Sequence, residues 1–137
     1  MVFFLGLVCI IGGFIIIMPL FMERHPGWKL VGEKLSSYKI IIGLAILIIG
    51  AITFIVPYHG HGRGKPLIPF LGDLFPSLFA ILTGLFISVE FLENLKGVKG
   101  PFIEKLKTGL SKYQFPIGFG SIFFGLLHWF IFWVIFF

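Results

Sequence analysis

The sequence predicts an all-α integral membrane protein with four transmembrane helices, arranged as two tandem two-helix repeats. The first observation behind this prediction is composition. Of 137 residues, 58% are hydrophobic and 12% are charged, and the mean hydropathy is +1.05. A typical soluble domain is about 45–50% apolar and about 25% charged. The second observation is an internal repeat, which fixes the architecture before any motif is interpreted.

The repeat appears when the chain is compared with itself at an offset of 71 residues, which becomes 75 residues further along because the second copy contains an insertion. The aligned pairs include Gly13 with Gly84, Lys34 with Lys105, Gly43 with Gly118, and Gly50 with Gly125. Residues 1–65 then form the first repeat with its outer loop, and residues 66–137 form the second. Because the two copies share one orientation, we expect a pseudo-two-fold axis along the membrane normal, as in other parallel repeats.

Four segments reach the roughly 20 apolar residues that a membrane-spanning helix needs. They run from about Val2 to Met22, from Ile40 to Pro57, from Leu74 to Leu95 and from Pro116 to Phe137. The first segment lacks a basic leading region and a small-residue cleavage site, so we interpret it as a retained helix rather than a signal peptide.

Charge predicts the orientation of these spans. Nine of the 11 basic residues fall in the two loops that follow spans one and three, and only Arg63 and Lys65 fall in the loop between spans two and three. Basic residues concentrate on the cytoplasmic side of membrane proteins. We therefore expect a multi-pass protein of the cell (cytoplasmic) membrane with both termini outside.

The two cytoplasmic loops mix apolar and charged residues at roughly helical spacing, in residues 27–35 and 100–107. This pattern predicts a short amphipathic helix on the inner leaflet in each loop. The alternative is a solvated connector.

Each predicted span carries a stripe of small residues on one face. The helix-packing positions are Gly6, Gly13, Gly43, Gly50, Ala80, Gly84, Gly118 and Gly125. Small residues let membrane helices approach closely. The stripes predict either a four-helix bundle packed through these faces or docking of some faces onto a second copy or a larger membrane protein.

One group of polar residues marks a candidate site within the membrane. His128 is the ionisable residue nearest the middle of a span, and Thr53 is its repeat counterpart. Intramembrane ionisable residues are functional candidates, although an imidazole can also serve as a hydrogen-bonding group between helices. Ser88 and Glu90 lie toward the inner end of span three, where Glu90 either pairs with a nearby lysine or contacts an ion or substrate.

The outer loop offers a second candidate site. His59, His61 and Arg63 lie in a glycine-rich stretch, and Asp73 caps the following span. Such a loop can bind an anion or a lipid phosphate. The two histidines with Asp73 also raise the possibility of a metal site, but the ligand set is smaller than most metal sites use. We expect no metal and no cofactor.

The sequence shows no nucleophile–base pair and no phosphate-binding motif, so we expect no enzymatic activity. Its net charge of +5 is spread over short loops, which argues against nucleic-acid binding. The expected partners are the lipid bilayer and either a second copy or a larger membrane protein. We predict an accessory or scaffolding subunit that docks through its small-residue faces. The alternative is a small transporter or channel lined by His128, Thr53, Ser88 and Glu90.

Overall fold

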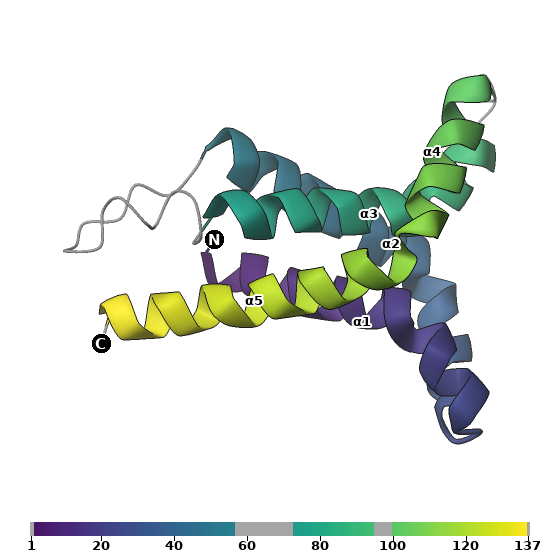
Figure 1. Ribbon diagram of the computed structural model, residues 1–137, viewed down its shortest axis with the longest axis horizontal. Helices are drawn as coiled ribbons and strands as arrows, with labels where there is room; N and C mark the ends of the chain where they lie inside the picture. The colour runs from purple at the N-terminus through teal and green to yellow at the C-terminus, as the bar shows by residue number, and fades with distance from the viewer. Residues whose placement is uncertain (1, 57–72, 95–99, 137) are drawn as a thin grey trace.

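The computed structural model describes residues 2–56, 73–94 and 100–136, and these ranges are almost entirely helical. The helices are α1 (Val2–Arg24), α2 (Trp28–Ile55), α3 (Phe75–Asn94), α4 (Pro101–Lys112) and α5 (Gln114–Phe136). Figure 1 shows α1, α2, α3 and α5 running side by side, with both ends of the chain at the same end of the bundle.

Three of these helices are long and apolar enough to cross a membrane, over Phe3–Arg24, Trp28–Ile55 and Gln114–Ile131. Helix α3 contributes a shorter apolar stretch, Phe75–Val89. An all-helical chain with spans of this length and composition is consistent with the predicted membrane protein.

The segment that follows the first predicted span differs from the prediction. Residues 28–35 do not form a separate short helix; they are the first turns of α2, which continues without a break into the predicted span. The physical reason is that no proline interrupts residues 28–55, so each added residue extends an existing helix instead of nucleating a new one. Helix α2 ends at Ile55, two residues before Pro57, because a proline disfavours helical backbone in the residue before it.

The connections from α1 to α2 and from α4 to α5 are short. His25, Pro26 and Gly27 separate α1 from α2, and the Trp28 amide donates to the His25 carbonyl to close the turn. Tyr113 alone separates α4 from α5. Pro116 lies in the first turn of α5, where its missing amide proton costs little.

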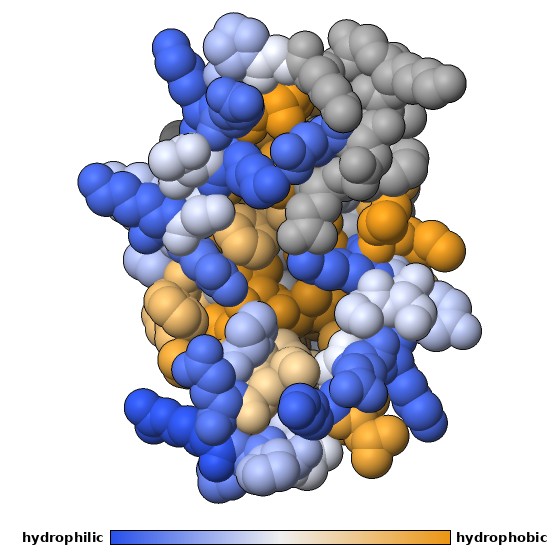
Figure 2. Space-filling view, turned by 90° about the vertical axis from the view of Figure 1, so that its right-hand side faces the viewer, coloured by the Kyte–Doolittle hydropathy of each residue, from blue (hydrophilic) through white to orange (hydrophobic). Residues whose placement is uncertain are grey.

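Two arms leave the bundle at the end opposite the chain termini. The first arm consists of the last turns of α1 with the first turns of α2, and the second arm consists of α4 with the last turns of α3 (Figure 1). Pro19 lies inside α1 near the start of the first arm, and a proline within a helix is a common cause of such a bend. Figure 2 views this end directly: hydrophilic side chains cover the two arms, and hydrophobic side chains are exposed between them.

The core lies between α1, α2, α3 and α5. Its buried members include Leu5, Cys9, Ile46 and Ile87. Phe86 is partly buried and packs against this core.

Candidate functional site

Two seams hold the bundle together, and both join helices from different halves of the chain. Along the α1–α5 seam, Gly13 faces Gly118. A Cβ atom added at Gly13 would lie 2.5 Å from the Gly118 carbonyl oxygen. Nearer the chain termini in the same seam, a Cβ atom at Gly125 would lie 2.8 Å from the Gly6 carbonyl oxygen. These four glycines therefore permit contact between the backbones of α1 and α5.

The α2–α3 seam is packed in the same way. A Cβ atom at Gly84 would lie 2.6 Å from the Leu47 amide nitrogen, and one at Gly50 would lie 2.9 Å from the Ala80 Cβ. At the inner end, a Cβ atom at Gly43 would lie 2.8 Å from the Ser88 hydroxyl oxygen. The small-residue faces thus meet helices of the same chain and are not free to contact a second protein.

Hydrogen bonds between helices add to this packing. The Ser121 hydroxyl of α5 donates to the Cys9 carbonyl of α1 over 2.8 Å, and the Gln114 amide donates to the Ile16 carbonyl over 3.0 Å. The Cys9 thiol donates to the Pro76 carbonyl over 3.2 Å, which ties α1 to α3. Sequence analysis did not identify Gln114 as a helix-joining residue, because a glutamine next to a loop gives no sign of which way it points.

A line of buried polar side chains begins just before α3 and continues along that helix. Asp73, Ser77, Thr83 and Ser88 are all fully or almost fully buried. The line extends over about 22 Å, at 1.5 Å of rise per residue. The sequence did not predict Thr83 as a site residue, because it lies beside the small-residue stripe and not on it.

Two hydroxyls in this line have no hydrogen-bond partner within the described part of the chain. They belong to Thr83 and Ser88, and both oxygens are inaccessible to solvent. A buried hydroxyl without a partner carries a desolvation penalty, so such groups call for a structural or functional explanation.

His128 is fully buried in the second half of α5. One turn before it, Phe124 stacks on Phe75 and Phe79 of α3, with ring centroids 5.3 Å and 4.9 Å apart. His128 therefore lies beyond this aromatic stack, at the same end of the α3–α5 contact as the buried Asp73. Ser88 lies at the opposite end of α3, so His128 and Ser88 do not form one compact site.

The remaining predicted site residues fall elsewhere. Thr53 is half-buried, and its hydroxyl donates to the Ile49 carbonyl of its own helix over 2.8 Å. The side chain of Glu90 lies outside the described part of the structure, as do His59, His61 and Arg63 of the outer loop. Among the described residues, no three histidine, cysteine or carboxylate side chains come together as a metal site would require.

A protein-family model matches residues 1–128, so the chain belongs to that family, which is itself uncharacterised. We found no significant match among curated proteins or among solved structures.

Proposed function

We propose that the chain is an integral membrane protein in which α1, α2, α3 and α5 all cross the bilayer. Three of them have the required length and composition, and α3 packs between the other spans. The basic residues of both arms gather at one end of the bundle, and this end is then the cytoplasmic one.

Matching contacts support the two-repeat arrangement. Gly13 packs against Ile122 in the α1–α5 seam, and Gly84 packs against Leu47 in the α2–α3 seam. Gly84 is the repeat counterpart of Gly13, and Ile122 is the counterpart of Leu47. Equivalent residues thus make equivalent contacts, as a pseudo-two-fold axis along the bundle would require.

A second pair of contacts follows the same rule. Gly125 packs against Cys9, and Gly50 packs against Ala80. These residues correspond in the repeat, Gly50 with Gly125 and Cys9 with Ala80. In this arrangement the first helix of each repeat packs on the second helix of the other.

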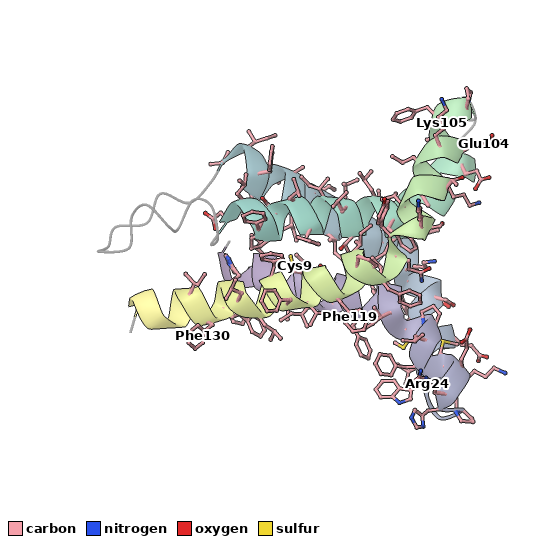
Figure 3. The ribbon with its side chains drawn as sticks, viewed as in Figure 1. Cys9, Arg24, Glu104, Lys105, Phe119 and Phe130 are labelled. Carbon is pink, nitrogen blue, oxygen red and sulfur yellow. The ribbon has the colours of Figure 1, made fainter. Side chains whose placement is uncertain are left out.

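We propose that the protein is a non-enzymatic accessory subunit that docks to a second membrane protein or to its own copy. Because the small-residue faces already pack against helices of the same chain, we assign docking to the face of α5 that points away from the other helices. The residues of that face recur at helical spacing and are exposed: Phe115, Phe119, Phe123, Leu126 and Phe130. Figure 3 shows Phe119 and Phe130 pointing away from the other helices.

The observation that carries this proposal is a difference between the repeats. The counterparts of the α5 face on α2 are Ile40, Leu44, Ile48, Ala51 and Ile55, with no aromatic ring among them. Apart from Phe54, the large side chains that residues 40–55 of α2 expose are aliphatic, so contact with lipid alone does not account for a row of rings along α5. Aromatic side chains offer large contact areas, and van der Waals packing drives the association of membrane helices.

A pair of photo-crosslinking amino acids tests the proposal in native membranes. One replaces Phe123, which is 61% exposed, and the matched control replaces its repeat counterpart Ile48, which is 56% exposed. We expect a discrete protein adduct from position 123 and lipid adducts alone from position 48. The mass of the adduct separates a second copy from a different partner. Lipid adducts alone at both positions would reject docking through α5.

The unpartnered hydroxyls of Thr83 and Ser88 favour a second candidate, a small transporter or channel in which water or a solute supplies their missing partner. Together with Asp73 and His128 they mark a polar path along α3. Flux of protons, small ions and small solutes into proteoliposomes tests it. We expect Ser88→Ala or Thr83→Val to change a wild-type flux at least several-fold. Absence of flux from the wild-type protein would remove this candidate.

A further inference from the structure

A pocket of about 490 Å³ lies between α3, α4 and α5 at the base of the second arm. Ligand pockets typically measure about 300–1,000 Å³. The side chains lining this one are mainly apolar and come from all three helices: Phe79 and Leu82 from α3, Leu106 and Leu110 from α4, and Ile117 from α5.

The packing around the pocket fixes its walls. The Phe79 ring is held between Phe124, on which it stacks, and Gly120, where an added Cβ atom would collide with it. Leu110 and Ile117 are buried, so they are anchored by neighbours behind the pocket surface. An ion pair between Lys107 and Glu93, with 2.7 Å between Nζ and Oε2, fastens α4 to the end of α3. Packing and the ion pair therefore hold the walls of the pocket in place at the junction between the three helices.

The polar groups at the pocket belong to Lys105 and Tyr113. Helix α4 as a whole is basic, since it carries three lysines and a single carboxylate, Glu104. Lys105 lies nearer to the bundle than Glu104, which is on the side of α4 facing away from it (Figure 3). The pocket thus combines an apolar interior with a cation on its bilayer side.

We propose that this pocket binds an anionic phospholipid of the inner leaflet, with one acyl chain inside the pocket and the headgroup phosphate on Lys105. The apolar walls offer no hydrogen bond or charge to a free phosphate ion, whereas they can pack against an acyl chain. Basic pockets at the cytoplasmic side of membrane helices attract anionic headgroups. This inference rests on the membrane placement proposed above, but not on docking through α5.

The first arm also has a pocket, between α1 and α2, but it is not suited to the same ligand. Its volume is about 230 Å³, and both Glu33 and Lys39 line it. The Met22 side chain packs closely against Gly32 beside it. A carboxylate in the same pocket as the lysine disfavours an anionic headgroup, so we expect one specific lipid for each chain rather than two.

Gly109 provides a sharp test, because it lines the pocket and a Cβ atom added there would meet no atom within 4 Å. We therefore expect Gly109→Phe to place its ring in the pocket, and it replaces a glycine inside a helix with a better helix former. Lys105→Gln removes the cation and leaves the apolar walls intact. Gly27→Phe is the matched control, since Gly27 also faces open space but lies on the first arm, away from both pockets.

Native mass spectrometry of the full chain from mixed micelles measures retention of the lipid. The probes are phosphatidylglycerol and phosphatidylcholine with identical acyl chains. We expect the wild type and Gly27→Phe to retain one phosphatidylglycerol, at least tenfold in preference to phosphatidylcholine. Gly109→Phe and Lys105→Gln should each lower that retention about tenfold, with unchanged thermal unfolding in lipid-free detergent.

Equal retention by the wild type and Gly109→Phe would overturn the proposal, as would equal retention of the two lipids by the wild type. A loss of retention accompanied by unfolding of both pocket variants would also count against it, because the open space at Gly109 predicts a folded protein. None of these results depends on the crosslinks at Phe123, so the two proposals fail independently.

Discussion

Gly84 of α3 lies against the backbone of Leu47 in α2, so close that a Cβ atom at position 84 would be 2.7 Å from the Leu47 Cα. Backbone atoms at a helix crossing cannot move aside as the end of a flexible side chain can. Gly84 therefore sets the distance between α2 and α3.

Gly84→Leu should consequently destabilise the protein by about 1–3 kcal/mol or more, the usual range for overpacking a tight site. Thermal unfolding in lipid-free detergent measures the effect. Gly109→Leu is the matched control, since it introduces the same side chain into a helix where nothing lies within 4 Å. Equal unfolding temperatures for the two variants would contradict the close crossing.

A second prediction concerns the hydrogen bond from the Ser121 hydroxyl to the Cys9 carbonyl, which joins α5 to α1. Ser121→Ala should cost about 0.6–1.7 kcal/mol, the range measured for hydrogen bonds between membrane helices. Ser77→Ala is the control, because Ser77 is equally buried but bonds to the Leu74 carbonyl within its own segment. Chemical unfolding in mixed micelles should rank Ser121→Ala as the less stable variant. The reverse ranking would show that the bond between the helices contributes little.

The chain's single cysteine, Cys9, should be unreactive in the folded protein, because it is fully buried and its thiol donates to the Pro76 carbonyl. A membrane-permeant maleimide should label it only after denaturation in sodium dodecyl sulfate. Rapid labelling of the native protein would mean that the α1–α3 contact opens readily.

The ion pair between Lys107 and Glu93 should contribute modestly to stability. Both side chains are partly exposed, and surface ion pairs are worth about 0–1 kcal/mol. Glu93→Gln should therefore lower stability slightly at low ionic strength and not at all near 1 M salt, where screening is strong. Thermal unfolding at the two salt concentrations checks this. A large loss that persists in high salt would point to a different role for Glu93.

Membrane topology can be tested by cysteine labelling in intact cells. The buried Cys9 provides a silent background. An impermeant reagent should label a cysteine at position 62, in the loop with few basic residues, and should not label Lys105→Cys until the cells are permeabilised. Labelling with the opposite sidedness would overturn the assignment of the two arms to the cytoplasm.

The sequence was a good guide to the helices and a poor guide to their pairing. Length and hydropathy predicted the spans because each stretch must satisfy its own backbone, whatever its neighbours are. The stripe containing Gly13 and Gly84 predicted close contacts, but it carried no information on which helix would meet each glycine. Small residues form a flat helix face, but they do not indicate which helix packs against it. Only the structure shows that Gly13 packs against α5 and Gly84 against α2.

The candidate site was predictable to a similar extent. The buried position of His128 followed from its place on the stripe of α5. The sequence did not predict that the Thr53 hydroxyl bonds within its own helix, or that the Thr83 hydroxyl has no partner among the described residues. Whether a threonine hydroxyl bonds to a carbonyl of its own helix or to a neighbouring helix depends on local geometry. The start of α2 at Trp28, well before the predicted span, depended on the absence of a proline, which is a weaker signal than an apolar run.

Pairing across the two halves has a consequence for biosynthesis. If the helices cross the bilayer as proposed, α1 and α2 enter the membrane before their seam partners, α5 and α3, have been made. The glycine faces of the first half then contact lipid until the second half is inserted. Final assembly begins only at that point. Two separately encoded halves, inserted into one membrane, would carry all the surfaces needed to find each other.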